Sequence, residues 1–154
     1  MFAQWSFYIA FSIIVCLSQA AFADEIAIQQ DSHGVDYVTG GIGSEEVEAL
    51  EPYKKQFNLY FLFSEGKAGR VIDNVNVEIV DRKNQPAFTL ESAAPRLMLN
   101  LPSGKYTVIA SYQGHAQRYG FNHQANKPQR IILNWRNAID GDATEDAPAE
   151  TATP

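Results

Sequence analysis

Cysteine is nearly absent from this sequence, which has a single one, Cys16, in 154 residues. Cys16 lies inside an apolar stretch near the amino terminus and follows Val15, whereas a lipid-attachment cysteine needs a small residue before it. If residues 1–23 are removed, the remaining chain cannot form a disulfide, a cysteine nucleophile or a thiolate metal site. Its stability must then come from apolar burial, which a domain of about a hundred residues can supply without cross-links.

Charge of one sign is missing from long parts of the chain. Residues 24–52 contain eight acidic residues and no Lys or Arg, and residues 137–154 contain five acidic residues and again no Lys or Arg. All 12 basic residues lie between Tyr53 and Arg136, together with five acidic ones. The net charge of −6 therefore conceals a basic block between two acidic flanks. A hydrophobic content of 45% excludes wholesale disorder, and the length allows only one ordinary domain.

The first 23 residues have the features of an export signal. Trp5 to Leu17 contains no charged residue, and Ala21-Phe22-Ala23 places small residues at the −3 and −1 positions before Asp24. The apolar stretch is shorter than the roughly 20 residues that a membrane-spanning helix needs. Because no Lys or Arg precedes the stretch, retention as an uncleaved anchor is an alternative. We expect a periplasmic or secreted protein with no transmembrane span after cleavage.

A short helix is expected after a polar leader. Residues 24–39 are polar without a sustained period and predict a loosely packed leader, and the glycine-rich residues 40–43 predict a turn. Ser44 is a candidate N-cap, followed by acidic residues in the first turn, and apolar residues recur at helical spacing to about Gln56. Pro52 should kink or end this helix near Glu51. The domain is therefore predicted to span residues 40–136.

Beyond the helix, the apolar period changes to two. Residues 57–63 are apolar on both faces, which predicts a strand whose outer face is covered by the preceding helix. Val75, Val77 and Ile79 alternate with polar residues, as in a strand with one wet face. Further strands are expected at residues 87–90, 97–101, 106–112, 117–121 and 130–135. The pattern predicts a mainly β fold, a seven-stranded antiparallel β-sandwich with one short N-terminal helix, followed by a disordered acidic tail at 137–154.

Two segments of this chain resemble a known family. Asp73 to Ile79 and Leu101-Pro102-Ser103-Gly104-Lys105-Tyr106-Thr107-Val108, with the turn between them, resemble the carboxypeptidase regulatory-like domains, which belong to the transthyretin-like (prealbumin-like) β-sandwiches. Pro102 presets φ, Gly104 supplies a tight turn, and Tyr106 and Val108 are expected to point inward. Residues 34–135 also look like a group of exported proteobacterial proteins with that domain. The resemblance implies an accessory, non-catalytic module with a prealbumin-like fold.

Catalytic and cofactor motifs are weak in this sequence. The glycine-rich turn at 40–43 resembles a phosphate loop, but no Lys follows it and Glu45 and Glu46 would repel an anion. None of the three histidines has a Glu three positions later, as a zinc carboxypeptidase requires. A metal pair of His115 and His123 across one hairpin leaves a small metal-dependent hydrolase as the alternative function. We expect no enzyme activity and no cofactor.

The basic block is the remaining candidate site. Its strand-associated cations and the tyrosines among them could bind an anionic lipid head group or polysaccharide, although solvation of the outer sheet faces also explains them. Export and the acidic flanks disfavour nucleic acid, and the acidic leader or tail would partly screen the basic residues. The sequence thus predicts an exported, non-enzymatic binding or structural accessory protein of the bacterial envelope, whose partner is an envelope protein or an anionic polysaccharide or lipid. The candidate surface consists of Arg96, Lys105, Arg118, Tyr119, Lys127, Arg130 and Arg136, with Tyr112 nearby.

Overall fold

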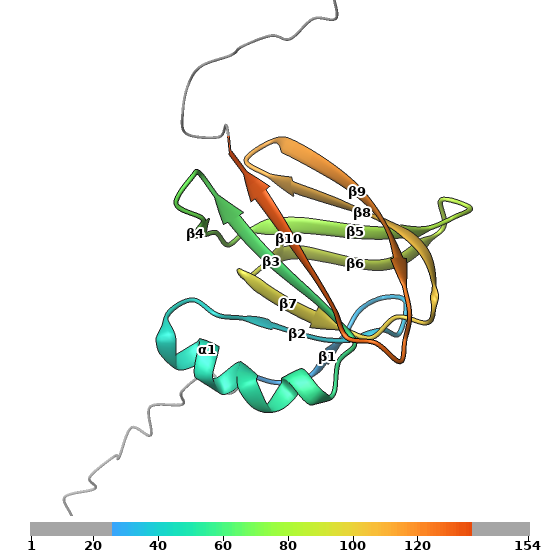
Figure 1. The fold of residues 1–154 in the computed structure, drawn as a ribbon, viewed down its shortest axis with the longest axis horizontal. Coiled ribbons are helices and arrows are strands. Elements are labelled where there is room, and N and C mark those ends of the chain that lie inside the picture. Colours follow the sequence, from blue (N-terminus) through green and yellow to red (C-terminus); the bar gives the residue numbers. More distant parts are fainter. Residues whose placement is uncertain (1–25, 137–154) are drawn as a thin grey trace, which may run out of the picture.

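A computed structural model describes residues 26–136 of the chain. This part is mainly β, with two sheets and one short helix (Figure 1). The expected export signal at 1–23 and the expected acidic tail at 137–154 lie outside the described residues.

The larger sheet, here called sheet A, has six strands in the order β1-β2-β7-β3-β10, with β4 also paired to β3. Strand β10 runs parallel to β3, and every other pair in the sheet is antiparallel. The strands are β1 (Gln29–Gln30), β2 (Asp36–Gly40), β3 (Leu59–Glu65), β4 (Arg70–Val71), β7 (Arg96–Leu99) and β10 (Gln129–Trp135).

The smaller sheet, sheet B, is antiparallel throughout, with the order β6-β5-β8-β9. Its strands cross those of sheet A at an angle, as β5 and β10 show in Figure 1. They are β5 (Val75–Asp81), β6 (Pro86–Ala93), β8 (Gly104–Tyr112) and β9 (His115–His123).

The main core lies between the two sheets. Successive strand residues point to opposite faces, so one apolar set from each strand is buried there. Sheet A contributes alternate residues of β3, β7 and β10, and sheet B contributes alternate residues of β5 and β8. Phe61 and Phe63 of β3 are fully enclosed, as are Ile79 of β5 and Phe88 of β6. This two-layer arrangement is consistent with the predicted β-sandwich.

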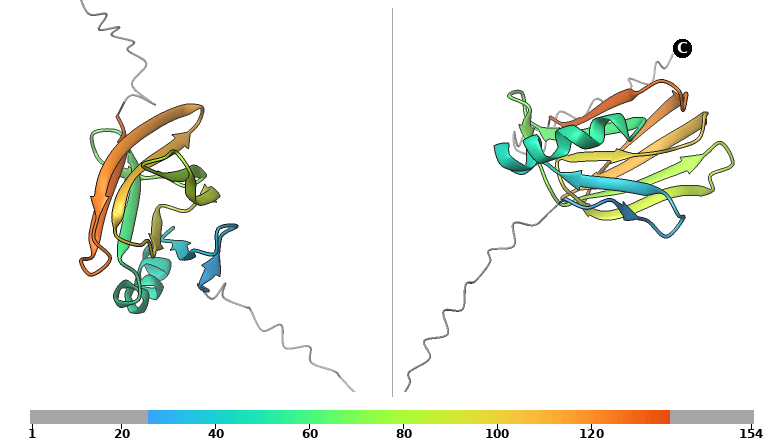
Figure 2. Two further views of the ribbon diagram at one scale, coloured as in Figure 1. Left: turned by 90° about the vertical axis from the view of Figure 1, so that its right-hand side faces the viewer. Right: turned by 90° about the horizontal axis from the view of Figure 1, so that it is seen from below.

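A second, smaller core covers the outer face of sheet A. Helix α1 (Ser44–Leu50) continues into the 3₁₀ helix η1 (Glu51–Lys55), and the two lie outside the sheets (Figure 2). Leu50 of the helix is buried with Val38 of β2 and Met98 of β7. The prediction that the helix covers the outer face of the 57–63 strand is confirmed at Tyr60, which packs against this core, but not at Leu62, which lies outside it.

The helix begins and ends somewhat differently from the sequence prediction. Ser44 is the first helical residue, and the N-cap is Gly43, whose φ is 90° and which makes no side-chain cap bond. The free amide N–H groups of Gly41 and Ile42 donate instead to the Glu46 carboxylate at 2.9 and 3.0 Å. Pro52 ends the α-helix as expected, because it lies in the first turn of η1.

The topology departs from the prediction in three respects. The expected seven strands correspond to β3 and β5–β10, and the structure adds the two-residue strands β1 and β4 and the five-residue strand β2. The leader is not loosely packed at its carboxyl end, because Tyr37 and Val38 of β2 are buried. The sandwich is not wholly antiparallel, because β10 joins β3 in parallel.

The turn at residues 102–104 works differently from the expectation. Gly104 does not have a positive φ. It leaves room for the ring of Tyr106, whose atoms would lie 3.2–3.3 Å from a Cβ at position 104. The Tyr106 hydroxyl donates to the carbonyl of Pro102 at 3.0 Å. Tyr106 packs against the main core and Val108 is buried in it, so both side chains point inward as predicted.

A buried carboxylate connects the two sheets at the amino-terminal side. The side chain of Asp31 is 1% exposed, and its two oxygens accept bonds of 2.9–3.0 Å from the amides of His33, Val35 and Thr89 and from the His33 ring. Thr89 belongs to β6, the edge strand of sheet B. Burial by itself would raise the pKa of Asp31, but these hydrogen bonds outweigh it and lower the pKa. Asp31 thus stays ionised and covers part of the β6 edge.

Candidate functional site

The structure separates the two histidines of the predicted metal pair. His115 and His123 are the first and last residues of β9. At about 3.3 Å per residue, their α-carbons are roughly 26 Å apart, so they cannot bind one metal ion. His123 is also buried rather than exposed in a turn, and its Nδ1 lies 3.1 Å from Oε1 of Gln129. The hydrolase that would use this pair therefore has no geometric support.

Within residues 26–136, no three His, Cys, Asp or Glu side chains are grouped so as to hold a metal ion. The same described part of the chain contains no helix that is long and apolar enough to cross a membrane. The features of residues 26–136 that could bind a partner are surface hollows and strand faces that no other element covers.

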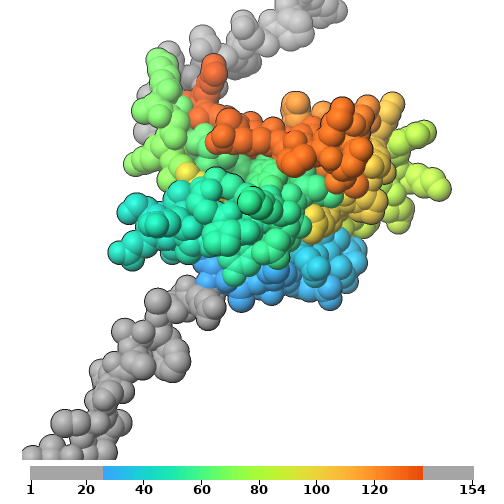
Figure 3. Space-filling view, turned by 60° about the horizontal axis from the view of Figure 1, so that its bottom comes forward, coloured from blue at the N-terminus to red at the C-terminus, as the bar shows by residue number. Residues whose placement is uncertain are grey.

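A groove runs between the helix and the outer face of sheet A. It consists of two adjoining hollows of about 510 and 550 Å³, which share Val47, Glu51 and Arg96. Figure 3 shows α1 and β10 on this same face of the molecule. The floor is formed by outward-facing residues of β3 and β7, namely Tyr60, Leu62 and Met98.

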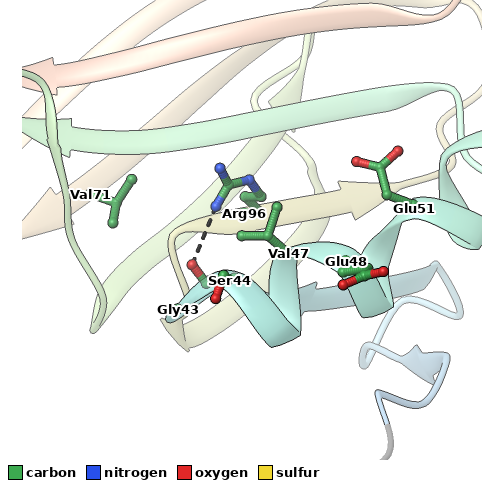
Figure 4. A pocket seen from close by; sticks show the side chains of 8 residues that line it. Gly43, Ser44, Val47, Glu48, Glu51, Val71 and Arg96 are labelled. Carbon is green, nitrogen blue, oxygen red and sulfur yellow. Dashed lines mark hydrogen bonds between the residues drawn. The ribbon is translucent and has the colours of Figure 1, made fainter.

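Arg96 lies at the centre of the groove and is fixed from two sides (Figure 4). Its Nη1 donates to the carbonyl of Gly41 at 3.2 Å, and its own carbonyl accepts from the Thr39 hydroxyl at 3.0 Å. A Cβ at Gly41 would lie 2.9 Å from Nη1 of Arg96, and Gly41 has a φ of 94°. The glycine at this position thus allows both the turn and the close approach of the arginine.

The Arg96 guanidinium has no carboxylate partner among the described residues, whose ion pairs are Asp31–His33, Glu51–Lys54 and Glu65–Arg70. An arginine presents five N–H donors, and Arg96 uses one of them in the bond to Gly41. The remaining donors are available to a carboxylate or phosphate group above the apolar floor.

The two walls of the groove carry opposite charges. The helix wall presents Glu48 and Glu51, of which Glu51 pairs with Lys54 on the same wall, and the opposite wall presents Arg130 of β10. The Tyr60 hydroxyl is occupied internally, since it donates to the carbonyls of Phe57 and Lys54. Burial raises the pKa of Tyr60, and the nearby Lys54 only partly offsets this. The Tyr60 hydroxyl therefore serves the packing of η1 against β3.

An apolar strip continues the groove toward the edge of the sheet. Ile132 of β10 is 56% exposed and lies beside Leu62, its partner in the parallel β3–β10 register. The helix covers Val38 and Met98 but leaves these two side chains outside the second core. This uncovered half of the outer face is open to a partner.

The predicted basic surface is not one surface. Arg96 and Arg130 line the groove. Lys105 and Arg118 lie on the outer face of sheet B, because they pair with Asn122 and Ile109 on the side opposite the core residues. The other members are Lys127 in the loop between β9 and β10, Arg136 just after β10, the 49% exposed Tyr119 of β9, and Tyr112, which packs on Trp135.

The groove was missed by sequence reasoning because its walls come from segments far apart in the chain. The local sequence feature that could indicate it is a strand with apolar residues at successive positions, so that both of its faces are apolar. Residues 57–63 were interpreted in that way, but the adjacent Ile131 and Ile132, which point to opposite faces of sheet A, were not.

No protein-family model matches this sequence, and no curated protein matches it.

Proposed function

We propose that this chain is an exported, non-enzymatic β-sandwich protein that binds a partner of the bacterial envelope through the groove between α1 and sheet A. The observation that carries the proposal is Arg96, a fixed arginine without a carboxylate partner among residues 26–136, set over a floor of Tyr60, Leu62 and Met98. A concave, largely apolar surface with a few fixed polar groups is the usual form of a binding site.

The resemblance to carboxypeptidase regulatory-like domains supports the same proposal. The residues that carry the resemblance form the Asp73–Asp81 region and the turn into β8, both of which contribute to the main core. They hold the two sheets together, while the groove lies on the opposite face of sheet A. A prealbumin-like sandwich would therefore serve as the scaffold, and the added helix would form the binding wall.

The proposal is tested by photocrosslinking in living cells. A photoreactive amino acid at position 132 faces the uncovered strip, and a matched control at the exposed position 122 faces outward from sheet B. We expect a discrete adduct from position 132 only, and a weaker adduct when Arg96→Gln is added. Equal adducts from both positions, or none from position 132, would contradict the proposed binding face.

Export is tested separately by amino-terminal sequencing of the protein recovered from the envelope. A mature chain that begins at Asp24 would support cleavage. A chain that begins at Met1 in the membrane fraction would support the tethered alternative.

A further inference from the structure

Within residues 26–136, each sheet has an edge without a paired strand on the same side of the molecule. Sheet A ends at β10 and sheet B ends at β9. The opposite edges are protected or short, because Asp31 covers part of β6 and β1 has only two residues. Long exposed edges are sites where another strand can pair, and proteins usually protect them. The unprotected edge is therefore a candidate interaction surface.

Strands β9 and β10 lie beside each other but are joined only through side chains. At one end, Gln117 Nε2 donates to the carbonyl of Asn134 at 2.8 Å. At the other end, His123 Nδ1 lies 3.1 Å from Gln129 Oε1. No ladder connects the two strands in the described part of the chain. The outer edge of β10 thus has backbone groups without a strand partner between these two contacts.

The register of β10 shows which backbone groups face outward. Gln129 donates its N–H to the carbonyl of Asn58, which directly precedes β3, so Gln129 faces sheet A. The carbonyl of Asn134 faces β9, because it accepts from Gln117. Backbone direction alternates along a strand. Arg130 and Ile132 lie four and two residues before Asn134. They therefore direct their N–H and carbonyl groups to the same outer edge as Asn134.

The chemistry of this edge favours an acidic and apolar partner. The charged residues of β10 and its two ends are Lys127 in the loop before it, Arg130 within it and Arg136 directly after it. Arg130 and Ile132 also point their side chains to the same outer face of sheet A, two positions apart. A strand added to β10 would place one residue beside Arg130 and another, two positions away, beside Ile132.

We propose that β10 receives an extended segment of another polypeptide as an added strand, with an acidic residue beside Arg130 and a branched apolar residue beside Ile132. This inference rests on the proposed function, because it gives the chemistry of a partner on the same face. Main-chain hydrogen bonds would provide affinity, and the two outward side chains would provide specificity. The acidic and apolar residues of the partner must therefore be two positions apart.

The acidic segment at 137–154 of this chain is the obvious rival occupant, since it follows β10 directly and has five acidic residues. It does not fit the pattern. Its one branched apolar residue is Ile139, and the residues two positions away are Asn137 and Gly141. The segment therefore has charge complementarity with the edge but lacks the acidic and apolar pair.

The test uses NMR titration of the full chain with a synthetic nine-residue peptide. The peptide is Thr-Glu-Thr-Val-Thr-Glu-Thr-Val-Thr, so its glutamate and valine side chains alternate along one face of an extended strand. A control peptide of the same composition has each valine next to a glutamate, so that the two lie on opposite faces. We expect the first peptide, and not the control, to slow hydrogen exchange at the amides of Arg130 and Ile132 about 10-fold or more.

Single substitutions separate edge binding from general charge attraction. Arg130→Gln should weaken binding of the first peptide about 2- to 5-fold, the loss expected for one exposed ion pair. Lys105→Gln removes a cation from the outer face of sheet B and should leave binding unchanged. An equal loss from both substitutions would overturn the proposed added strand in favour of nonspecific attraction.

The remaining outcomes are also decisive. Peptide-induced shifts around Arg96 without protection of Ile132 would overturn the added strand but leave the proposed groove intact. No shift anywhere on sheet A would overturn the inference, and the crosslinking experiment would still test the groove independently. If Arg130 and Ile132 are protected without peptide, and neutralising the five acidic residues of 137–154 removes that protection, the occupant is the chain's own segment and the proposal is wrong.

Discussion

The carboxylate of Asp31 accepts a hydrogen bond of 3.0 Å from the backbone N–H of Thr89, which lies 58 positions further along the chain. Because Asp31 lies between β1 and β2 of sheet A, and Thr89 in the edge strand of sheet B, this bond joins the two sheets. The same carboxylate orders its own turn through the amides of His33 and Val35. One buried side chain therefore fixes a turn and covers a strand edge.

Asp31→Asn should destabilise the protein. The substitution keeps the shape of the side chain but replaces an oxygen acceptor by an amide donor, which faces the N–H groups that Asp31 now satisfies. We expect a loss of about 2–3 kcal/mol in the free energy of unfolding, measured by urea denaturation. Asp36→Asn is the matched control, since Asp36 is exposed and accepts one bond from the exposed Gln30 side chain. A loss from Asp36→Asn as large as that from Asp31→Asn would contradict this explanation.

The stability should also depend on pH through Asp31. Its folded-state pKa is lowered, so its ionised form stabilises the fold. This contribution is complete above the unfolded-state pKa of about 3.9 and is lost as the pH falls through the folded-state value. The difference in unfolding free energy between the wild type and Asp31→Asn should therefore shrink as the pH falls below about 3.9. A difference that grew below that pH would have the wrong sign.

Gly41 and Gly43 offer a matched pair for the groove. Both have a positive φ, 94° and 90°, but a Cβ at Gly41 would meet the Arg96 side chain, whereas a Cβ at Gly43 would meet nothing within 4 Å. Gly43→Ala should cost about 1–3 kcal/mol from backbone strain alone, because φ 90° and ψ 168° are almost restricted to glycine. Gly41→Ala should cost about 1 kcal/mol more, because Arg96 must move. Only Gly41→Ala should also weaken the adduct formed from position 132.

The two-residue turn between β8 and β9 is a site for stabilisation. Gln113 and Gly114 both have positive φ, 48° and 82°, and Gln113 is poorly suited to that conformation. Gln113→Asn should raise the free energy of unfolding by about 0.5–1 kcal/mol. Gln124→Asn, in an exposed position without a positive φ, should change it little. Destabilisation by Gln113→Asn would indicate that the bond from Gln113 to the Tyr112 hydroxyl outweighs the turn preference.

The helix should detach when its one buried residue is shortened. Leu50 is 1% exposed and packs with Val38 and Met98. Leu50→Ala should cost about 2–4 kcal/mol and reduce the helical circular dichroism signal. Glu48→Ala, on the exposed face of the same helix, should have little effect on either measurement.

The parts of the fold that could be predicted are those set by local period and turn chemistry. Val75, Val77 and Ile79 face the core as their alternation indicated, and the helix covers the apolar strand before them at Tyr60. The turn that begins at Asp81 could be predicted from its residue types, because asparagine tolerates the φ of 57° that Asn84 adopts. These features depend on neighbours within about ten residues, so the sequence alone contains their cause.

The parts that could not be predicted depend on partners far along the chain. Nothing in the sequence near Asp31 indicates that the N–H of Thr89 will donate to it. The sequence therefore predicts a loosely packed leader at this position, although the Asp31 carboxylate joins the two sheets. The burial of His123 depends on packing around Gln129 rather than on its own turn. The basic residues were predicted as one surface, but strand alternation sends Arg118 and Arg130 to the outer faces of different sheets.

The parallel contact between β3 and β10 also constrains when the protein can fold. Leu59 is paired with Gln129, and Glu65 with Trp135, so every contact of this ladder closes a loop of seventy residues. Such high contact order slows folding, because the entropy of loop closure is lost before the contacts form. Ile131, Leu133 and Trp135 reach the main core only through this last strand. A chain still emerging during synthesis therefore lacks one wall of its core until nearly the whole domain has appeared.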